Sequence, residues 1–306
     1  MINSVTISDL QKDYDEVKAL KAINLEIKSG ELFGLIGPDG AGKTSLIRIL
    51  ATLLVPNNGN ANVLGLDVVK DYKILRKKIG YMPGRFSLYQ DLSVEENLTL
   101  FASIHNTTIE ENYHLIKDIY SQIEPFKKRK AGALSGGMKQ KLALSCAMIH
   151  EPEILYLDEP TTGVDAVSRN EFWDMLKELR DRGITIIVST PYMDEAELCD
   201  RVALMQLGEI LTVDTPQNIV EQFGKDLYAV RSNSKLHLQK DLESFEFADT
   251  VHAFGGYFHY TDKREGFNTD ELMSHLQELG HHEIELKKIA PEIEDCFMAL
   301  MTTGDE

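Results

Sequence analysis

The sequence has few cysteines and no long hydrophobic run, and each absence excludes a class of protein. Cys146, Cys199 and Cys296 lie far apart and form no Cys-x-x-Cys pair. Isolated thiols in odd number indicate reduced, buried side chains rather than a disulfide framework or a zinc site. No apolar run reaches the roughly 18–20 residues of a membrane span, and the N-terminal residues lack the pattern of a signal peptide. We therefore expect a cytosolic chain that does not cross a membrane alone.

Basic residues are also scarce. The 306 residues include 32 Lys and Arg against 49 Asp and Glu, a net charge of −17. This balance argues against nucleic acid as a partner, because such binding needs basic surface to displace counterions from phosphate. The one basic run, Lys127–Lys130, is most simply a solvated surface, with a phosphate or partner contact as the alternative. Apolar residues at 43% exclude wholesale disorder.

Strands and helices alternate along most of the chain. Near-continuous apolar strands joined by helices predict an α/β fold whose parallel sheet is covered on both faces. A mainly helical stretch, about 85–150, interrupts the alternation and is expected to form a subdomain. Strands are predicted at Ser4–Ser8, Ile23–Ile27, Glu31–Ile36, Ile154–Asp158 and Ile184–Ser189, and helices at about Gly42–Leu54 and around Phe172–Leu179.

The composition shifts after Phe223-Gly224, which divides the chain into a domain of residues 1–222 and a small α+β domain of residues 225–306. The second domain alternates short strands with helices. Its strands are predicted at Tyr228–Arg231, Tyr257–Tyr260 and Ile284–Leu286, and its helices at Asp270–Leu279 and Pro291–Met301.

A glycine-rich segment, Gly37–Thr44, fits G-x-x-x-x-G-K-[ST] between a predicted strand and a predicted helix. Its glycines let successive amides point at phosphate oxygens, and the helix N-terminus favours an anion. Lys43 is expected to reach the β- and γ-phosphates, and the Thr44 hydroxyl to take one Mg²⁺ position. A turn without a ligand is the alternative. The predicted cofactor-binding residues here are Gly37, Pro38, Asp39, Gly40, Ala41, Gly42, Lys43, Thr44 and Ser45.

Two acids close the apolar strand Ile154–Asp158. In a chain with a phosphate loop, Asp158 at the strand end is expected to hold Mg²⁺. Glu159 is then placed to act as the catalytic base that polarises a water toward the γ-phosphate. The alternative is a solvated acidic loop.

The string Leu134-Ser135-Gly136-Gly137-Met138 resembles the signature motif of ABC-transporter ATPases. Walker A at Gly37–Thr44 and Walker B at Ile154–Asp158 stand in the family's order, and Thr162–Asp165 resembles its D-loop. Tyr14 matches the aromatic residue that stacks on adenine, and Met193–Glu197 matches the stretch after the last strand. The resemblance covers residues 1 to about 222. It implies a P-loop NTPase fold with N-terminal antiparallel strands and a helical subdomain.

The resemblance also implies partners. ATP and Mg²⁺ would lie between one phosphate loop and Ser135, Gly136 and Gly137 of a second ATPase subunit, self or related, in a head-to-tail dimer. A separate integral membrane permease would place the chain peripherally on the cytoplasmic face of the membrane. The ending Glu285–Leu300 and the pattern Gly37–Gly40 resemble the ATPases of bacterial ABC-2 type exporters.

Two positions depart from the family pattern. Gly84 stands where the family places a glutamine that reaches Mg²⁺ and the attacking water, and Pro191 stands where it places the switch histidine. Gln90 lies six residues late. These losses should slow hydrolysis more than they weaken binding. We therefore expect a slow site on this chain, in an asymmetric pair with a regular ATPase or in a slow homodimer, and a gain of activity from Gly84→Gln with Pro191→His.

Two other functions remain open at this point. A regulatory subunit that binds nucleotide but scarcely hydrolyses it is favoured by Gly84 and Pro191. A soluble ABC protein of translation or DNA repair is disfavoured, because those types usually carry two cassettes or a long coiled coil.

Overall fold

The chain divides into two compact units, Met1–Thr215 and Pro216–Glu306, and the computed structural model describes residues 2–302. Helix α7 (Pro216–Glu221) falls in the second unit, where it contacts α10 (Ile293–Thr302). The composition shift places α7 in the first domain instead. The contacts of α7 with α10 therefore assign this helix to the second unit, which the composition of the sequence does not indicate.

Two sheets form the first unit. The smaller is antiparallel, in the order β2-β1-β4-β5, and its first two strands form a long hairpin. The larger has the order β10-β9-β3-β8-β7-β6; its strands run parallel except for β10, which pairs antiparallel with β9. The strands are β1 (Asn3–Tyr14), β2 (Val17–Lys28), β3 (Leu32–Ile36), β4 (Asn58–Val63), β5 (Leu66–Asp67), β6 (Ile79–Met82), β7 (Ile154–Asp158), β8 (Thr185–Thr190), β9 (Arg201–Gln206) and β10 (Glu209–Asp214).

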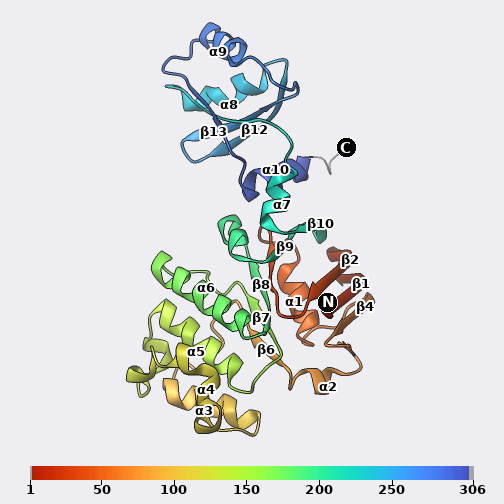
Figure 1. The fold of residues 1–306 in the computed structure, drawn as a ribbon, viewed down its shortest axis with the longest axis vertical. Coiled ribbons are helices and arrows are strands. Elements are labelled where there is room, and N and C mark those ends of the chain that lie inside the picture. Colours follow the sequence, from red (N-terminus) through yellow and green to blue (C-terminus); the bar gives the residue numbers. More distant parts are fainter. Residues whose placement is uncertain (1, 303–306) are drawn as a thin grey trace. The chain divides into compact units, whose positions relative to one another are not determined.

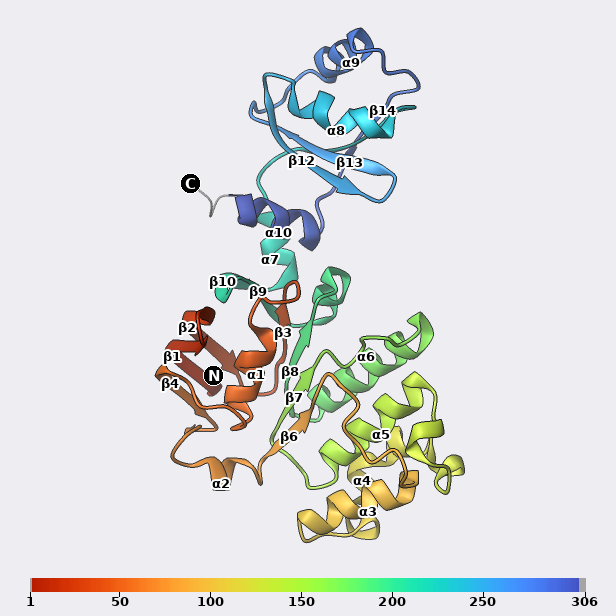
Figure 2. The same ribbon diagram turned by 180° about the vertical axis from the view of Figure 1, so that it is seen from behind.

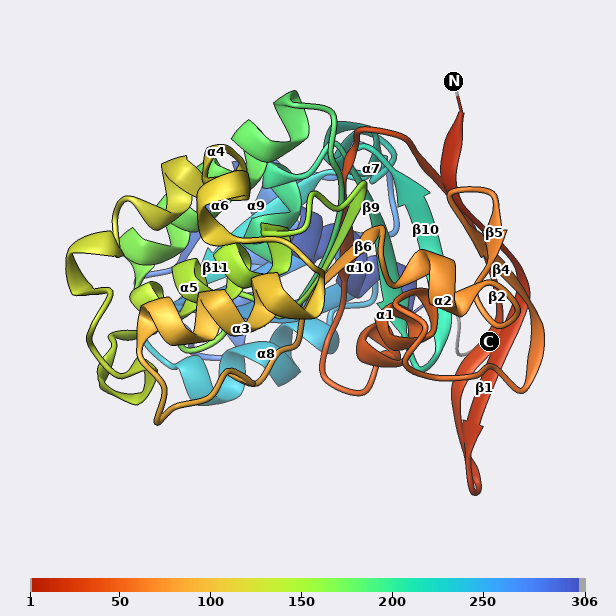
Figure 3. The same ribbon diagram turned by 90° about the horizontal axis from the view of Figure 1, so that it is seen from below.

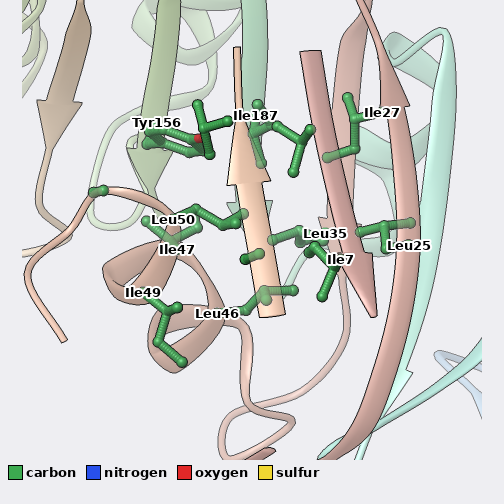
Figure 4. Close-up of a cluster of buried hydrophobic side chains, with 14 of the residues drawn as sticks. Ile7, Leu25, Ile27, Leu35, Leu46, Ile47, Ile49, Leu50, Tyr156 and Ile187 are labelled. Atoms are coloured by element: carbon green, nitrogen blue, oxygen red, sulfur yellow. The ribbon is translucent and has the colours of Figure 1, made fainter. Parts of the chain in front are cut away.

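Helix α1 (Lys43–Leu50) lies between the two sheets, where it forms the centre of the main core (Figures 3 and 4). Its apolar side chains Leu46, Ile47 and Leu50 are fully buried, together with Ile7 of the small sheet and Ile187 of the large one. Burial of large aliphatic side chains stabilises a fold by roughly 1.5–3 kcal/mol each. This packing fixes where the N-terminus of α1, and the loop that precedes it, must lie.

The other face of the large sheet is covered by α6 (Ala166–Asp181), beyond which lies a helical subdomain (Figures 1 and 2). The predicted parallel sheet with helices on both faces is therefore confirmed. Short segments complete the first unit: α2 (Tyr72–Leu75) and the 3₁₀ helices η1 (Glu124–Phe126), η2 (Ala131–Ala133) and η3 (Met193–Leu198). The subdomain consists of α3 (Val94–Ile104), α4 (Ile109–Tyr120) and α5 (Gly136–Met148).

After α7, the second unit has the order of elements β-α-β-β-α-β, followed by α10. Its antiparallel sheet β12-β13-β11-β14 packs one face against two helices, with Tyr260, Val230, Leu242 and Leu272 in the core. The elements are β11 (Leu227–Arg231), α8 (Lys235–Glu243), β12 (Ala248–Phe254), β13 (Tyr257–Asp262), α9 (Thr269–Glu278) and β14 (Glu285–Ile289). The predicted α+β appendage is confirmed.

Several element boundaries differ from the prediction. The helix expected over Gly42–Leu54 ends at Leu50, because Thr52 turns with a φ of 61° and leaves Leu53 52% exposed. The first strand, β1, is longer than predicted and continues to Tyr14. Strands β9 and β10 are additional, because the sequence analysis predicts no strand there. Within residues 2–302, no helix combines the length and hydrophobicity that crossing a membrane requires.

Candidate nucleotide-binding site

The phosphate loop connects β3 to α1, and its glycines are required for two different reasons. A Cβ at Gly37 would lie 2.1 Å from the Met205 carbonyl oxygen, and one at Gly42 would lie 2.5 Å from that of Ala19. Gly40 instead has a φ of 82° with nothing within 4 Å of its Cβ position. Gly37 and Gly42 thus allow tight packing, and Gly40 adopts a left-handed conformation with open space beside it.

Lys43 opens α1 and is almost completely buried, at 3% exposure. Its ammonium donates to the carbonyl oxygens of Gly37 (2.6 Å) and Pro38 (3.0 Å). Burial lowers the pKa of Lys43, while Glu159, Asp39 and Asp158 oppose that shift. Gly42 caps α1 without a side-chain hydrogen bond. The helix N-terminus and the ammonium therefore offer positive charge at one place.

Thr44 and Asp158, the two residues that the sequence predicts to hold Mg²⁺, lie within hydrogen-bond distance of each other. The Thr44 hydroxyl donates to Asp158 Oδ1 over 2.9 Å, and the Ser189 hydroxyl donates to the same oxygen over 2.8 Å. Asp158 is 3% exposed. A buried carboxylate beside a threonine hydroxyl is a donor set of hard oxygens, the kind that Mg²⁺ prefers.

Glu159 has a strained backbone that Ser189 holds in place. Its φ is 50°, in the left-handed region that non-glycine residues rarely adopt. Its N–H donates to Ser189, to both the carbonyl and the hydroxyl oxygen at 3.0 Å. Its carboxylate lies 3.8 Å from the Lys43 ammonium and accepts from the Thr162 hydroxyl at 3.5 Å. The geometry aims the carboxylate at the phosphate loop.

Tyr14 is the last residue of β1 and lies beside the first turn of α1. Its ring is 42% exposed, and its hydroxyl oxygen lies 3.4 Å from Ser45 Oγ. The ammonium of Lys12 lies 5.3 Å above the ring. An exposed aromatic ring at the border of the loop is suited to stacking on a base.

Ser135, Gly136 and Gly137 begin α5, across the central strands from α1 (Figure 1). The Ser135 hydroxyl caps the helix by accepting from the Met138 N–H at 3.4 Å. A Cβ at Gly137 would lie 2.6 Å from Ser168 Oγ, so the helix start packs tightly against the start of α6. Within one chain, this segment and the phosphate loop belong to different layers.

Of the two departures, Gly84 lies beside the carboxylates, and Pro191 follows a residue that contacts the phosphate loop. A Cβ at Gly84 would lie 2.9 Å from the Asp158 carbonyl oxygen, so the loop after β6 packs against the end of β7. Pro191 follows β8, and the preceding Thr190 carbonyl oxygen accepts from the Gly37 N–H at 3.3 Å. Gln90 is held elsewhere, because its carbonyl oxygen accepts from the Gly132 N–H at 2.9 Å.

In the basic run, Lys127 and Lys130 pair with Glu95 and Asp91. Sequence reasoning missed Ser189, Thr161 and Glu195. Ser189 binds both Asp158 and Glu159. Consecutive hydroxyls, Ser189 and Thr190, at the end of an apolar strand are the signal that could have revealed it.

Comparison with known proteins gives consistent results. The family model described as ABC transporter matches residues 20–162. The probable multidrug ABC transporter ATP-binding protein YbhF of Escherichia coli K12 is 39% identical over 305 residues, which are 97% of this chain and 52% of the relative. The chain thus spans about half the length of that relative. The Nod factor export ATP-binding protein I of Rhizobium sp. N33 is 32% identical over 308 residues, with 99% and 98% coverage.

Solved structures show the same fold. CbiO1 from Clostridium perfringens, part of the ABC transporter complex cbiONQ, superposes with a TM-score of 0.66 at 27% identity, covering 73% of this chain and 92% of that one. A dimeric bacterial ABC transporter cassette superposes with a TM-score of 0.63 at 26% identity, with coverage of 69% and 98%.

Proposed function

This chain belongs to the ATP-binding proteins of ABC transporters, and from that premise we propose that it binds ATP with Mg²⁺ and hydrolyses it to drive export through a separate membrane permease. The observation that carries the proposal is the convergence of the Lys43 ammonium, the Thr44 hydroxyl and the two carboxylates at the end of β7. The four groups come from two motifs more than a hundred residues apart, Gly37–Thr44 and the end of β7. Their meeting leaves an arrangement suited to a magnesium-bound triphosphate.

Different residues of the site would bind different parts of MgATP. The amides of the phosphate loop and the Lys43 ammonium would bind the β- and γ-phosphates. Thr44 and Asp158 would hold Mg²⁺, which supplies charge neutralisation between phosphate oxygens. Tyr14 would stack on the adenine. The hard oxygens of Thr44 and Asp158 and the open space beside Gly40 both fit this assignment.

Glu159 is our candidate for the catalytic base. Its carboxylate lies 3.8 Å from the Lys43 ammonium and its side chain is 25% exposed, so a water molecule could reach it. The two hydrogen bonds to Ser189 fix its backbone. A general base oriented in this way contributes about 10²–10⁴-fold to a rate.

A second subunit would complete the site. Ser135 and the two glycines form a helix N-terminus that can receive an anion, but they lie in a different layer from this chain's own phosphate loop. A head-to-tail dimer with an identical or related subunit would bring them to the partner's ATP, which would then stabilise the dimer. The permease would place the chain at the cytoplasmic face of the membrane.

A second candidate function is a regulatory subunit that binds ATP but cleaves it slowly. It is favoured by Gly84 and Pro191, which bring no side-chain donor to the carboxylates. The slow site would then be paired with a faster one on a related subunit.

One experiment tests the proposal and separates the two functions. Calorimetric titration with ATP should give binding that EDTA abolishes or strongly weakens, and single-turnover assays should detect cleavage. Glu159→Gln should bind ATP like the parent and cleave it about 10²–10³-fold more slowly. Glu153→Gln, which changes an acid at the opposite end of β7, is the matched control. No magnesium-dependent affinity for ATP would refute both functions, and binding without cleavage would select the regulatory one.

A further inference from the structure

A buried carboxylate in the stretch Met193–Glu197, to which no role has been assigned above, joins segments of the site. Glu195, in η3, is 1% exposed. Its Oε2 accepts hydrogen bonds from the hydroxyls of Thr161, at 3.1 Å, and Thr190. Thr161 follows the catalytic carboxylates, and Thr190 ends β8 directly before Pro191. One oxygen atom thus connects the two loops that border the predicted γ-phosphate position.

The charge of Glu195 is balanced from α6. Its Oε1 has no hydrogen-bond partner among residues 2–302 but lies 3.7 Å from Arg169 Nε. The Arg169 guanidinium also lies 4.4 Å from the centre of the Tyr192 ring. A buried carboxylate with one countercharge and two hydroxyl donors is costly to rearrange, because each broken contact leaves a polar group unpaired.

The bonds that Glu195 anchors continue to the reacting groups. On the side of Thr161, two backbone hydrogen bonds hold the loop. The Thr162 N–H donates to the Glu159 carbonyl oxygen, and the Val164 N–H donates to the Thr161 carbonyl oxygen. From Thr190, the backbone carbonyl accepts from the Gly37 N–H of the phosphate loop. A displacement at Glu195 would therefore reach Glu159 on one side and the phosphate loop on the other.

We propose that Glu195 is a positioning residue: it holds the loop Thr161–Asp165 in register with the phosphate loop, so that Glu159 is aligned for cleavage. This role rests on the proposed ATPase function. Pro191 makes it more important in this chain, since proline lacks both an N–H and a side-chain donor with which to connect the two loops. Glu195 supplies that connection through its buried hydrogen bonds to Thr161 and Thr190, without contacting the nucleotide.

The test uses the full chain and two conservative variants. Thr161→Val removes one hydroxyl at nearly constant volume, and Glu195→Gln removes the charge that faces Arg169. Each should lower single-turnover cleavage by about tenfold, because small displacements of catalytic groups are expensive, and leave the dissociation constant of MgATP within about twofold. The double variant should lose less than the product of the two effects, since both act through one network. Glu197→Gln, an exposed acid in the same 3₁₀ helix, should match the parent.

Hydrogen exchange provides a second measurement that does not depend on turnover. Amides in residues 159–165 should exchange faster in Thr161→Val and Glu195→Gln than in the parent or in Glu197→Gln. Unchanged exchange, or a loss of affinity equal to the loss of cleavage, would overturn the role of Glu195. A parent chain that fails to bind ATP would instead refute the proposed function, and exchange alone would then decide whether Glu195 holds the loop.

Discussion

The two sides of the candidate site differ in how many groups they direct at the nucleotide. On the side of α1 and β7, Lys43, Thr44 and Asp158 are buried or partly buried and bonded to one another or to the loop. On the side of residues 84 and 191, a glycine and a proline offer no side-chain donor. The first side would bind the ground state, and the second would act on the transition state. Affinity and turnover should therefore respond separately to substitution.

The largest effect should come from the complete side. Lys43→Ala removes the ammonium that lies 2.6 Å from the Gly37 carbonyl oxygen and 3.8 Å from Glu159. A charge-assisted contact to phosphate is among the strongest that a protein makes, so we expect affinity for MgATP to fall at least about a hundredfold. Calorimetric titration measures the loss directly.

Lys70→Ala is the control for this substitution, because the Lys70 side chain is 82% exposed and belongs to the turn after β5. It should leave affinity unchanged. If Lys43→Ala retained the parent's affinity while the protein stayed folded, the phosphate loop would not be where the triphosphate binds.

The incomplete side should respond in the opposite direction. Pro191→His restores an imidazole beside Thr190 and an N–H that proline lacks. An added hydrogen bond to the γ-phosphate that strengthens in the transition state should raise single-turnover cleavage by about tenfold, with little change in affinity. Rapid-quench measurement at saturating ATP gives the rate.

Pro125→His, at an exposed position in η1, is the matched control and should not change the rate. A Pro191→His variant that cleaves no faster than the parent would show that the slow step lies elsewhere, for example in the closure of the dimer.

The local structure around the candidate site could be predicted because each motif carries its own local geometry. A strand, a glycine turn and a helix N-terminus follow one another in the sequence, so Gly37–Thr44 needs no distant residue to form the loop. Helix α3 begins with a capping box of Ser93 and Glu96, which is local in the same way because the two residues are three positions apart. Local chemistry of this kind can be read directly from the sequence.

Contacts between distant segments could not be predicted in the same way. Glu195 meets Thr161 across 34 positions, and nothing in the short polar stretch around either residue marks them as partners. The strands β9 and β10 escaped prediction because pairing, not pattern alone, defines them. Ser189 likewise acquires its role only when β8 lies beside β7, which places its hydroxyl on Asp158.

The absence of a side chain at position 84 removes a donor from the incomplete side of the site. It also has a steric reason, because there is little space for a side chain at this position. A Cβ there would lie 2.9 Å from the Asp158 carbonyl oxygen, a backbone atom that cannot rotate away. Gly84→Ala should therefore destabilise the fold by about 1–3 kcal/mol, whereas Gly256→Ala, with nothing within 4 Å of the new Cβ, should be nearly neutral. Chemical denaturation measures both.

The same contact limits how the missing glutamine can be restored. Gly84→Gln must first move the loop away from β7, so it should gain less turnover than Pro191→His, and part of any gain should be lost through displacement of Asp158. Equal stability of Gly84→Ala and the parent would show that the loop moves freely. Steric exclusion would then not explain why the glutamine is absent. In that case the double substitution Gly84→Gln with Pro191→His should give the full gain in turnover.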